Sequence, residues 1–285
     1  MWKRLMICLL TVALLMMATA SVQPSFYDVN GDGSVTDDDV QLLLQYDMGA
    51  IETLPFDSGL PDTTKMDGVA AYREVTGGMV KRYVETPRDE QVSASAIYYT
   101  VAAKAGDTVA LPVYIHADDN PIVLVDIQQV VYDRTLLALT DVILYEDVAA
   151  TSQSVMNGDH IRILYNEPVP NNMFDLQFTV LQDLEEGMFL SVGLQGVSAV
   201  VEDDAEWAEA TIDTEPGGIR CITRGDLKNA IVGVQSSLDM RLYAEDEIPS
   251  VMAALEEARR VVDDPDASTD EIMDAFKALN IPIQF

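Results

Sequence analysis

The chain has 285 residues, of which 48 are acidic and 17 are basic, so its formal net charge at pH 7 is −31. This charge argues strongly against nucleic acid as a ligand, because phosphate binding needs clustered Lys and Arg, and it disfavours adsorption to anionic membranes through a polybasic patch. Since 48% of the residues are hydrophobic and 23% are charged, the composition is typical of folded protein. The length accommodates about two domains or several small modules.

The first residues have the parts of a secretory signal peptide. Lys3 and Arg4 precede an apolar stretch, which ends in the small-residue cleavage site Ala-Thr-Ala at 18–20. An uncleaved membrane anchor is the alternative, but the apolar stretch is shorter than the roughly 20 residues that a spanning helix needs. We therefore expect a secreted protein that loses residues 1–20. Cys221 is then the only remaining cysteine, and we expect it to be a small buried hydrophobe in a strand.

Residues 28–39 have the spacing of a calcium-binding loop. Oxygen donors stand at loop positions 1, 3, 5, 9 and 12, and a glycine stands at position 6, where the chain must turn sharply. Since Ca²⁺ takes about six to eight hard oxygen ligands, this spacing predicts one bound calcium ion. The alternative, an acidic loop that caps the following helix from Thr36, is compatible with calcium binding. The candidate ligands are Asp28, Asn30, Asp32, the Ser34 carbonyl, Thr36 directly or through water, and Asp39.

The loop and the helix expected after it, from Asp37 to about Met48, resemble one half-repeat of a dockerin. Position 12 is Asp39 rather than the Glu of an ordinary EF-hand, and the few residues between the signal and the loop leave no room for an incoming helix. A dockerin carries two such halves, but residues 56–62 lack the donor spacing. The resemblance therefore implies one calcium ion rather than two, with a helix after the degenerate loop.

The resemblance also implies a partner for this module, which we place at residues 24–84. A dockerin docks on a cohesin of another protein, and the family's recognition residues match Asp37 and Asp38 in the first turn of the expected helix. Two adjacent carboxylates would suit a basic patch on the partner.

Residues 92–223 have short strand-like runs separated by Gly, Asn and Asp turns, which predicts an all-β sandwich or jelly roll. Four pieces within this segment resemble a cohesin in their order and spacing. They are residues 101–115, 130–137, 158–165 and 174–180. The resemblance implies a non-catalytic domain that binds the dockerin of a secreted polysaccharide-degrading enzyme. A carbohydrate-binding sandwich is the alternative for this segment.

The run from Val123 to Tyr132 changes the phase of its apolar positions midway, which indicates a β-bulge. Asp126, Gln128 and Gln129 lie in this run. Because cohesins present a flat sheet face to the dockerin, these three residues are candidate partner contacts, with solvated strand positions as the alternative interpretation.

Residues 226–285 have apolar residues at helical spacing, which predicts a three-helix bundle. Ser268 and Glu271 form a capping box for the last helix, and Pro265 interrupts the chain before it. The segment resembles the FIVAR module of secreted Gram-positive proteins, and the resemblance implies an accessory spacer or a ligand-contact role.

Conventional catalytic side chains after residue 20 are limited to His116, His160 and Cys221, and no motif pairs them. We therefore expect no enzyme activity. One hypothesis is a secreted cellulosomal adaptor, or scaffoldin, that joins dockerin-bearing enzymes to another cohesin and is held at the cell surface through that partner. The other is a calcium-stabilised surface adhesin or carbohydrate-binding protein. Because glycans stack on flat aromatic rings and Trp207 is the only tryptophan after the signal, the sequence favours the adaptor.

Overall fold

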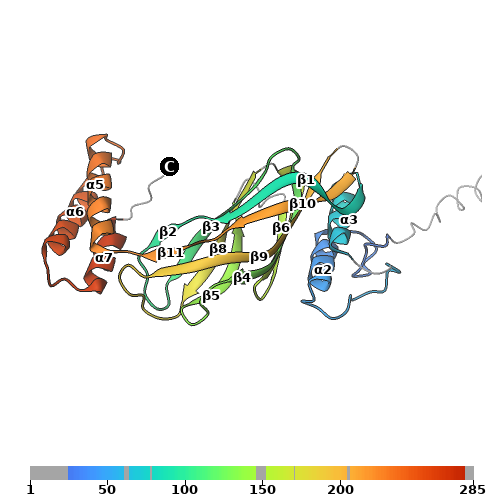
Figure 1. Cartoon of the computed structure of the whole chain (residues 1–285), viewed down its shortest axis with the longest axis horizontal. Coiled ribbons are helices and arrows are strands. Elements are labelled where there is room, and N and C mark those ends of the chain that lie inside the picture. Colours follow the sequence, from blue (N-terminus) through green and yellow to red (C-terminus); the bar gives the residue numbers. More distant parts are fainter. Residues whose placement is uncertain are drawn as a thin grey trace, which may run out of the picture. The chain divides into compact units, whose positions relative to one another are not determined.

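A computed structural model describes residues 25–60, 64–77, 79–145, 152–169, 171–203 and 206–279. The chain divides into two compact units, Met1–Met79 and Val80–Phe285 (Figure 1). The expected signal peptide lies outside the described residues. None of the helices that the structure describes is long and apolar enough to cross a membrane.

Two helices, α2 (Asp37–Asp47) and α3 (Lys65–Thr76), carry the core of the first unit. Each begins with a capping box, in which a threonine and the aspartate three residues later satisfy free amides of the first turn. The helices approach closely because Gly68 has no side chain: a Cβ there would lie 2.7 Å from Leu44 Cδ2. The helix predicted after the degenerate second loop is confirmed, and its apolar residues Val69 and Tyr72 are buried.

The described residues of the second unit form eleven strands and three helices. Nine strands pair in the order β5-β8-β3-β1-β10-β9-β4-β7-β6, while β11 pairs with β9 and β2. The strands are β1 (Arg82–Ala96), β2 (Tyr99–Val101), β3 (Thr108–Ala117), β4 (Ile122–Val131), β5 (Leu137–Leu144), β6 (Ser152–Asn157), β7 (His160–Val169), β8 (Asn171–Val180), β9 (Phe189–Glu202), β10 (Glu206–Glu215) and β11 (Gly217–Cys221).

The strands form a sandwich, because the two halves of this order share one apolar core. Leu111 of β3 and Phe178 of β8 belong to the same buried cluster as Ile127 of β4 and Ile163 of β7. Along β3 and the described part of β8, buried residues alternate mostly with half-buried ones, as expected for strands with one face on a core. The predicted β-sandwich is confirmed. The pieces at 101–115, 158–165 and 174–180 contain most of β3, the start of β7 and most of β8, whereas 130–137 spans the turn between β4 and β5.

The predicted change of phase in β4 is also confirmed, although its cause differs from the predicted bulge. Ile127 and Val130 both face the core, while Gln128 and Gln129 between them are exposed. The register of β4 with β9 stays continuous over this stretch, and the register shift falls at the start of β4 instead. Beside Gln128, Gly196 of β9 has a φ of 61°. The backbone irregularity that changes the phase therefore involves both β4 and β9, which remain in register.

Three helices, α5 (Arg224–Asp239), α6 (Ile248–Asp263) and α7 (Thr269–Leu279), pack around a second apolar core. The predicted capping box of α7 is confirmed: the Ser268 hydroxyl donates to Glu271 Oε2 at 2.9 Å, and the Ser268 amide donates to the same oxygen at 2.8 Å. Cys221 belongs to the sandwich core, whereas the next residue, Ile222, belongs to the helical core. The helices therefore follow the sandwich without a linker.

Candidate functional site

The acidic loop of the first unit is held by hydrogen bonds from its own backbone. Asp28 Oδ1 accepts the Gly31 amide at 2.9 Å, and Asp28 Oδ2 accepts the Gly33 amide at 3.0 Å. The Asn30 and Asp32 side chains each accept the amide two residues further on, both at 2.9 Å. Gly33 has a φ of 94°, so the sharp turn predicted at position 6 is confirmed.

Asp39 is fully buried and has a different role from the other candidate ligands. Its Oδ1 accepts the amides of Val29 and Asn30 at 2.9 and 3.0 Å. Its Oδ2 accepts the amide and the hydroxyl of Thr36 at 3.0 and 3.1 Å. Asp39 therefore ties the start of the loop to the first turn of α2, and its two oxygens together take four hydrogen bonds.

The donor set partly fits a calcium ion. Asp28, Asn30 and Asp32 present hard oxygens from one short loop, and each carboxylate oxygen keeps a further lone pair beside the amide that it accepts. The Asp39 carboxylate is already satisfied by protein donors. Within the described ranges, no three His, Cys, Asp or Glu side chains gather as a metal cluster. A calcium ion would thus be held by the loop residues. Asp39 would either give up some of its hydrogen bonds to coordinate the metal, or keep them and orient the loop without contacting the metal.

The segment after α2 contacts this loop. The Phe56 amide donates to the Val29 carbonyl at 2.9 Å, and the Phe56 ring lies so close to Gly31 that a Cβ there would be 2.9 Å from it. The start of the degenerate second half thus packs on the first loop. Asp37 and Asp38, the candidate docking residues, are both exposed in the first turn of α2.

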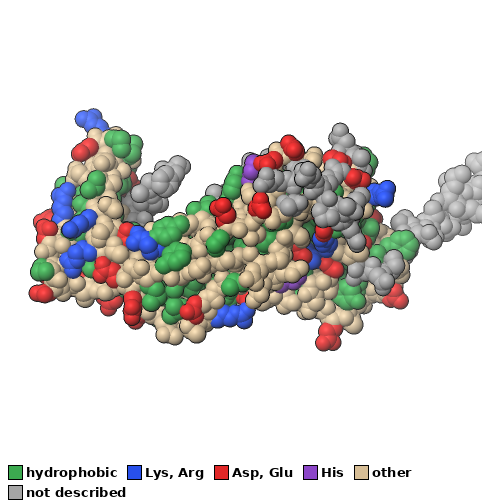
Figure 2. Space-filling model, in the orientation of Figure 1, with side chains coloured by type: hydrophobic (Ala, Val, Ile, Leu, Met, Phe, Trp, Pro, Cys, Tyr) green, Lys and Arg blue, Asp and Glu red, His purple; other side chains and the backbone are tan. Residues whose placement is uncertain are grey.

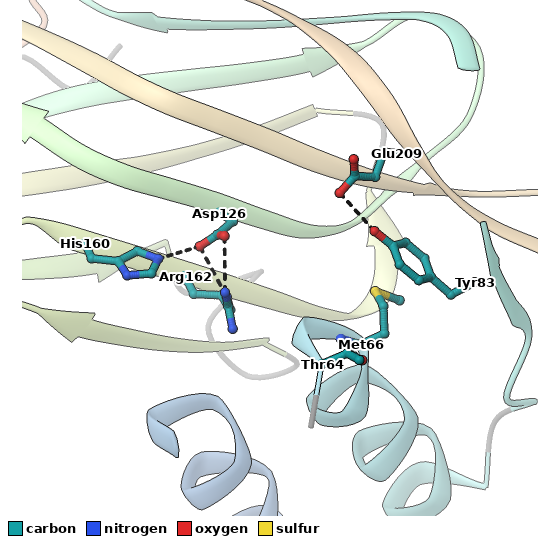
Figure 3. A network of polar contacts seen from close by, with 7 residues as sticks. All are labelled: Thr64, Met66, Tyr83, Asp126, His160, Arg162 and Glu209. Atoms are coloured by element: carbon teal, nitrogen blue, oxygen red, sulfur yellow. Dashed lines mark hydrogen bonds and ion pairs between the residues drawn. The ribbon is translucent and has the colours of Figure 1, made fainter. Parts of the chain in front are cut away.

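Asp126 was a candidate partner contact, which requires an exposed side chain, but the structure buries it. It is 7% exposed, and Arg162, directly opposite on β7, donates to it twice, from Nε at 3.2 Å and from Nη2 at 3.1 Å. His160 Nε2 lies 2.7 Å from Asp126 Oδ1 (Figure 3). Gln128 and Gln129 remain exposed, so they are the two candidates on β4 that can still contact a partner.

This cluster determines the charge of Asp126. Burial by itself raises the pKa of a carboxyl group, but here hydrogen bonds from His160 and Arg162, together with the positive charge of Arg162, outweigh burial and lower the pKa of Asp126. The carboxylate is therefore ionised and paired at neutral pH. Because both charged groups are buried, removal of either partner would leave an unpaired buried charge in the sheet.

The outer face of β3, β8 and β5 carries half-buried and exposed side chains. Its residues alternate with the core positions, and Ile143 and Tyr145 at the β5 end are both 40% exposed. The Tyr145 hydroxyl donates to Asp175 Oδ1 of β8 at 2.8 Å, and burial together with this carboxylate raises the pKa of Tyr145 to about 12. Gln177 lies two residues further along β8 on the same face.

The three conventional catalytic side chains are used separately. His116 Nε2 lies 3.1 Å from Asp118, and His160 belongs to the Asp126 cluster. Cys221 is a buried free cysteine, as predicted, and burial raises the pKa of its thiol to about 11. A thiol with such a pKa is protonated at pH 7 and is a poor nucleophile.

No protein-family model matches the chain, and no curated protein matches it. Similar solved structures are cohesin domains. They include the seventh ScaB type I cohesin from Pseudobacteroides cellulosolvens (18% identity, TM-score 0.39, 47% of this chain and 94% of that chain). They also include a type I cohesin–dockerin complex from Clostridium thermocellum (17%, 0.37, 46% and 99%) and a non-cellulosomal cohesin from the archaeon Archaeoglobus fulgidus (15%, 0.36, 49% and 96%). At these identities and TM-scores the likeness carries no functional argument.

Proposed function

We propose that the chain is a secreted, non-catalytic adaptor, or scaffoldin, of the cohesin and dockerin type. The observation that carries the proposal is the combination of two binding elements in one chain. The first unit has a calcium-type loop that leads directly into α2, and the second unit has a β-sandwich whose outer face is partly exposed. Joining a dockerin-like unit and a cohesin-like sandwich in one chain raises the local concentration of an enzyme bound to the sandwich near the partner that binds the first unit.

The first unit binds one Ca²⁺ and docks on the cohesin of another protein, which holds the adaptor at the cell surface. Support comes from the dockerin-like spacing of residues 28–39 and from the two exposed carboxylates, Asp37 and Asp38, at the start of α2. Because both contacts are acidic, the partner presents a basic patch. The two binding elements must differ in specificity, since otherwise the sandwich would capture the first unit of the same chain.

Reversing the charge of the docking turn tests the first half of the proposal. Asp37→Lys combined with Asp38→Lys is expected to weaken binding to a cohesin by about tenfold or more at low salt, and the loss shrinks as salt rises, because exposed charges are screened. Surface plasmon resonance against cohesins of the source organism measures it. Glu52→Lys, an exposed change in the same unit, is the control. Unchanged cohesin binding by the double variant would remove this helix turn as the docking site.

The sandwich binds the dockerin of a secreted polysaccharide-degrading enzyme. We assign this contact to the outer face of β3, β8 and β5 rather than to β4, since the Asp126 carboxylate is occupied by Arg162 and His160. The exposed Tyr145 and the half-buried Gln177 lie on this same outer face, and tyrosine is enriched at the centres of protein interfaces.

Capture from culture fluid tests this assignment with two matched pairs of variants. The immobilised full chain is expected to retain dockerin-bearing enzymes of the source organism, and Tyr145→Ala with Gln177→Ala is expected to lower retention at least about tenfold, as for an interface hot spot. Gln128→Ala with Gln129→Ala is the control on β4. Loss of retention only in the β4 pair would transfer the contact to that strand. Retention of glycans without any dockerin-bearing protein would contradict the adaptor and favour the carbohydrate-binding alternative.

A further inference from the structure

An exposed pair of aromatic rings lies on the outer face of the small sheet that β9, β11 and β2 form. Phe189, the first residue of β9, is 52% exposed, and Tyr98, next to the start of β2, is 47% exposed. Their ring centroids are 6.0 Å apart, and the ring planes differ by 14°. Tyr98 precedes β2 and Phe189 begins β9. Because β2 and β9 pair with opposite edges of β11, the two rings meet across β11.

The pair is supported from the β11 side. Gly218 of β11 is buried, and a Cβ at this position would come within 2.6 Å of Phe189 Cζ, so the Phe189 ring lies against bare backbone. The Arg220 guanidinium lies 5.7 Å from the centroid of the Tyr98 ring and forms an ion pair with Asp226. Asp226 is itself fixed, because it accepts the amide and the hydroxyl of Thr223 at the start of α5.

We propose that Tyr98 and Phe189 form a binding surface for a neutral polysaccharide. Nearly parallel rings that are held in place and open to solvent provide the flat apolar faces on which the C–H groups of a sugar ring stack. The Arg220–Asp226 pair beside them offers donors and acceptors for sugar hydroxyls. Because the rings are already positioned, a ligand does not have to order them, and this lowers the cost of binding.

The surroundings of the pair favour a glycan over a protein partner. A stable protein interface buries about 800 Å² on each partner around an apolar centre. Here the aromatic pair is bordered on β9 and β11 by Ser191, Gly217 and Arg220, which are small or polar, and beside Tyr98 by Ile97 and Tyr99, which are 40% and 38% exposed. Tyr99 adds a third exposed ring for sugar stacking, while the polar border limits the apolar area available to a protein. In Figure 2, hydrophobic side chains reach the surface of this unit between acidic ones. With a net charge of −31, the chain repels acidic polymers, so a neutral glycan fits best.

Affinity electrophoresis of the purified full chain in native gels tests the proposal. The probes are hydroxyethyl cellulose, arabinoxylan and galactomannan, with polygalacturonate as the acidic counterpart. At least one neutral polymer is expected to retard the chain, and polygalacturonate is not. Tyr98→Ala and Phe189→Ala are each expected to weaken the retardation by about tenfold, the size of one lost aromatic contact.

Matched variants separate binding from folding. Tyr98→Phe keeps the ring and is expected to bind like the unchanged chain. Leu181→Ala removes an apolar side chain that is 46% exposed just after β8, and it is expected to have no effect on retardation. Trp207 is buried in β10, so its fluorescence shows whether Phe189→Ala is folded. The proposal is overturned if no neutral polymer retards the unchanged chain. It is also overturned if both alanine variants are retarded as strongly as the unchanged chain. If the alanine variants instead lose only enzyme capture, the rings contact protein and the glycan proposal fails, while the adaptor stands.

Discussion

Arg162→Met is expected to lower the free energy of unfolding of the sandwich by about 3 kcal/mol, because breaking a buried ion pair leaves an unpaired charge behind. The side chains of Arg162 and Asp126 are 5% and 10% exposed, and two hydrogen bonds join them. Methionine fills a similar volume but leaves the carboxylate with His160 alone. Urea unfolding followed by Trp207 fluorescence measures the effect, since Trp207 is buried in β10 of the same sandwich.

Two further variants show whether the loss comes from the stranded charge. Arg134→Met removes an ion pair with Asp159, but the Arg134 side chain is 66% exposed, so the change is expected to stay within about 0.5 kcal/mol. Asp126→Leu combined with Arg162→Met removes both charges and is expected to be more stable than Arg162→Met alone. An equal loss in the double variant would mean that Arg162 acts through packing.

The same pair makes the penalty depend on pH. The pKa of Asp126 is lowered in the folded protein, so its ion pair contributes stability above the unfolded pKa of about 4 and loses it as the pH falls through the folded value. The difference between the unchanged chain and Arg162→Met should therefore be larger at about pH 5 than at about pH 3.

Local features of this fold could be predicted from the sequence because their partners are close along the chain. Gly33 and the Asp28 carboxylate shape the loop within five residues, and Ser268 and Glu271 cap α7 within three. The alternation of apolar residues along β3 likewise depends only on which neighbours face the core. In each case the residues that determine the local structure and the backbone that they shape lie within one short segment.

The misplaced candidates depend on pairing between distant strands. Alternation places Asp126 away from the core, but it does not reveal that Arg162, 36 residues later, lies opposite and occupies it. Tyr98 and Phe189 were missed for the same reason, because only the insertion of β11 between β2 and β9 brings their rings together. Gly218 was a usable indication, since a glycine inside a strand often marks a close approach by another group.

The largest effect in the first unit is expected from Asp39. Asp39→Ala removes the acceptor for the amides of Val29 and Asn30 and for both donors of Thr36, all at a fully buried position. Leaving the buried Val29 amide unpaired costs about 1–3 kcal/mol, and the part-buried donors of Asn30 and Thr36 add to this loss, so α2 should lose stability even in EDTA. Far-UV circular dichroism during thermal unfolding measures this loss. A melting curve like that of the unchanged chain would contradict the capping role.

Calcium binding by the Asp39 variants then distinguishes a ligand from an orienting residue. If Asp39 only holds Val29 and Asn30 in place, Asp39→Asn keeps an oxygen for those amides, and its calcium affinity should stay within a few-fold of the unchanged chain. If Asp39 exchanges its hydrogen bonds for the metal, loss of its charge should make Asp39→Asn as weak as Asp39→Ala. Either role predicts a loss of about tenfold or more for Asp39→Ala, since removing even an outer partner of a metal site typically costs that much. Titration calorimetry decides between the two roles, and an unchanged affinity in Asp39→Ala would refute the calcium site built on residues 28–39.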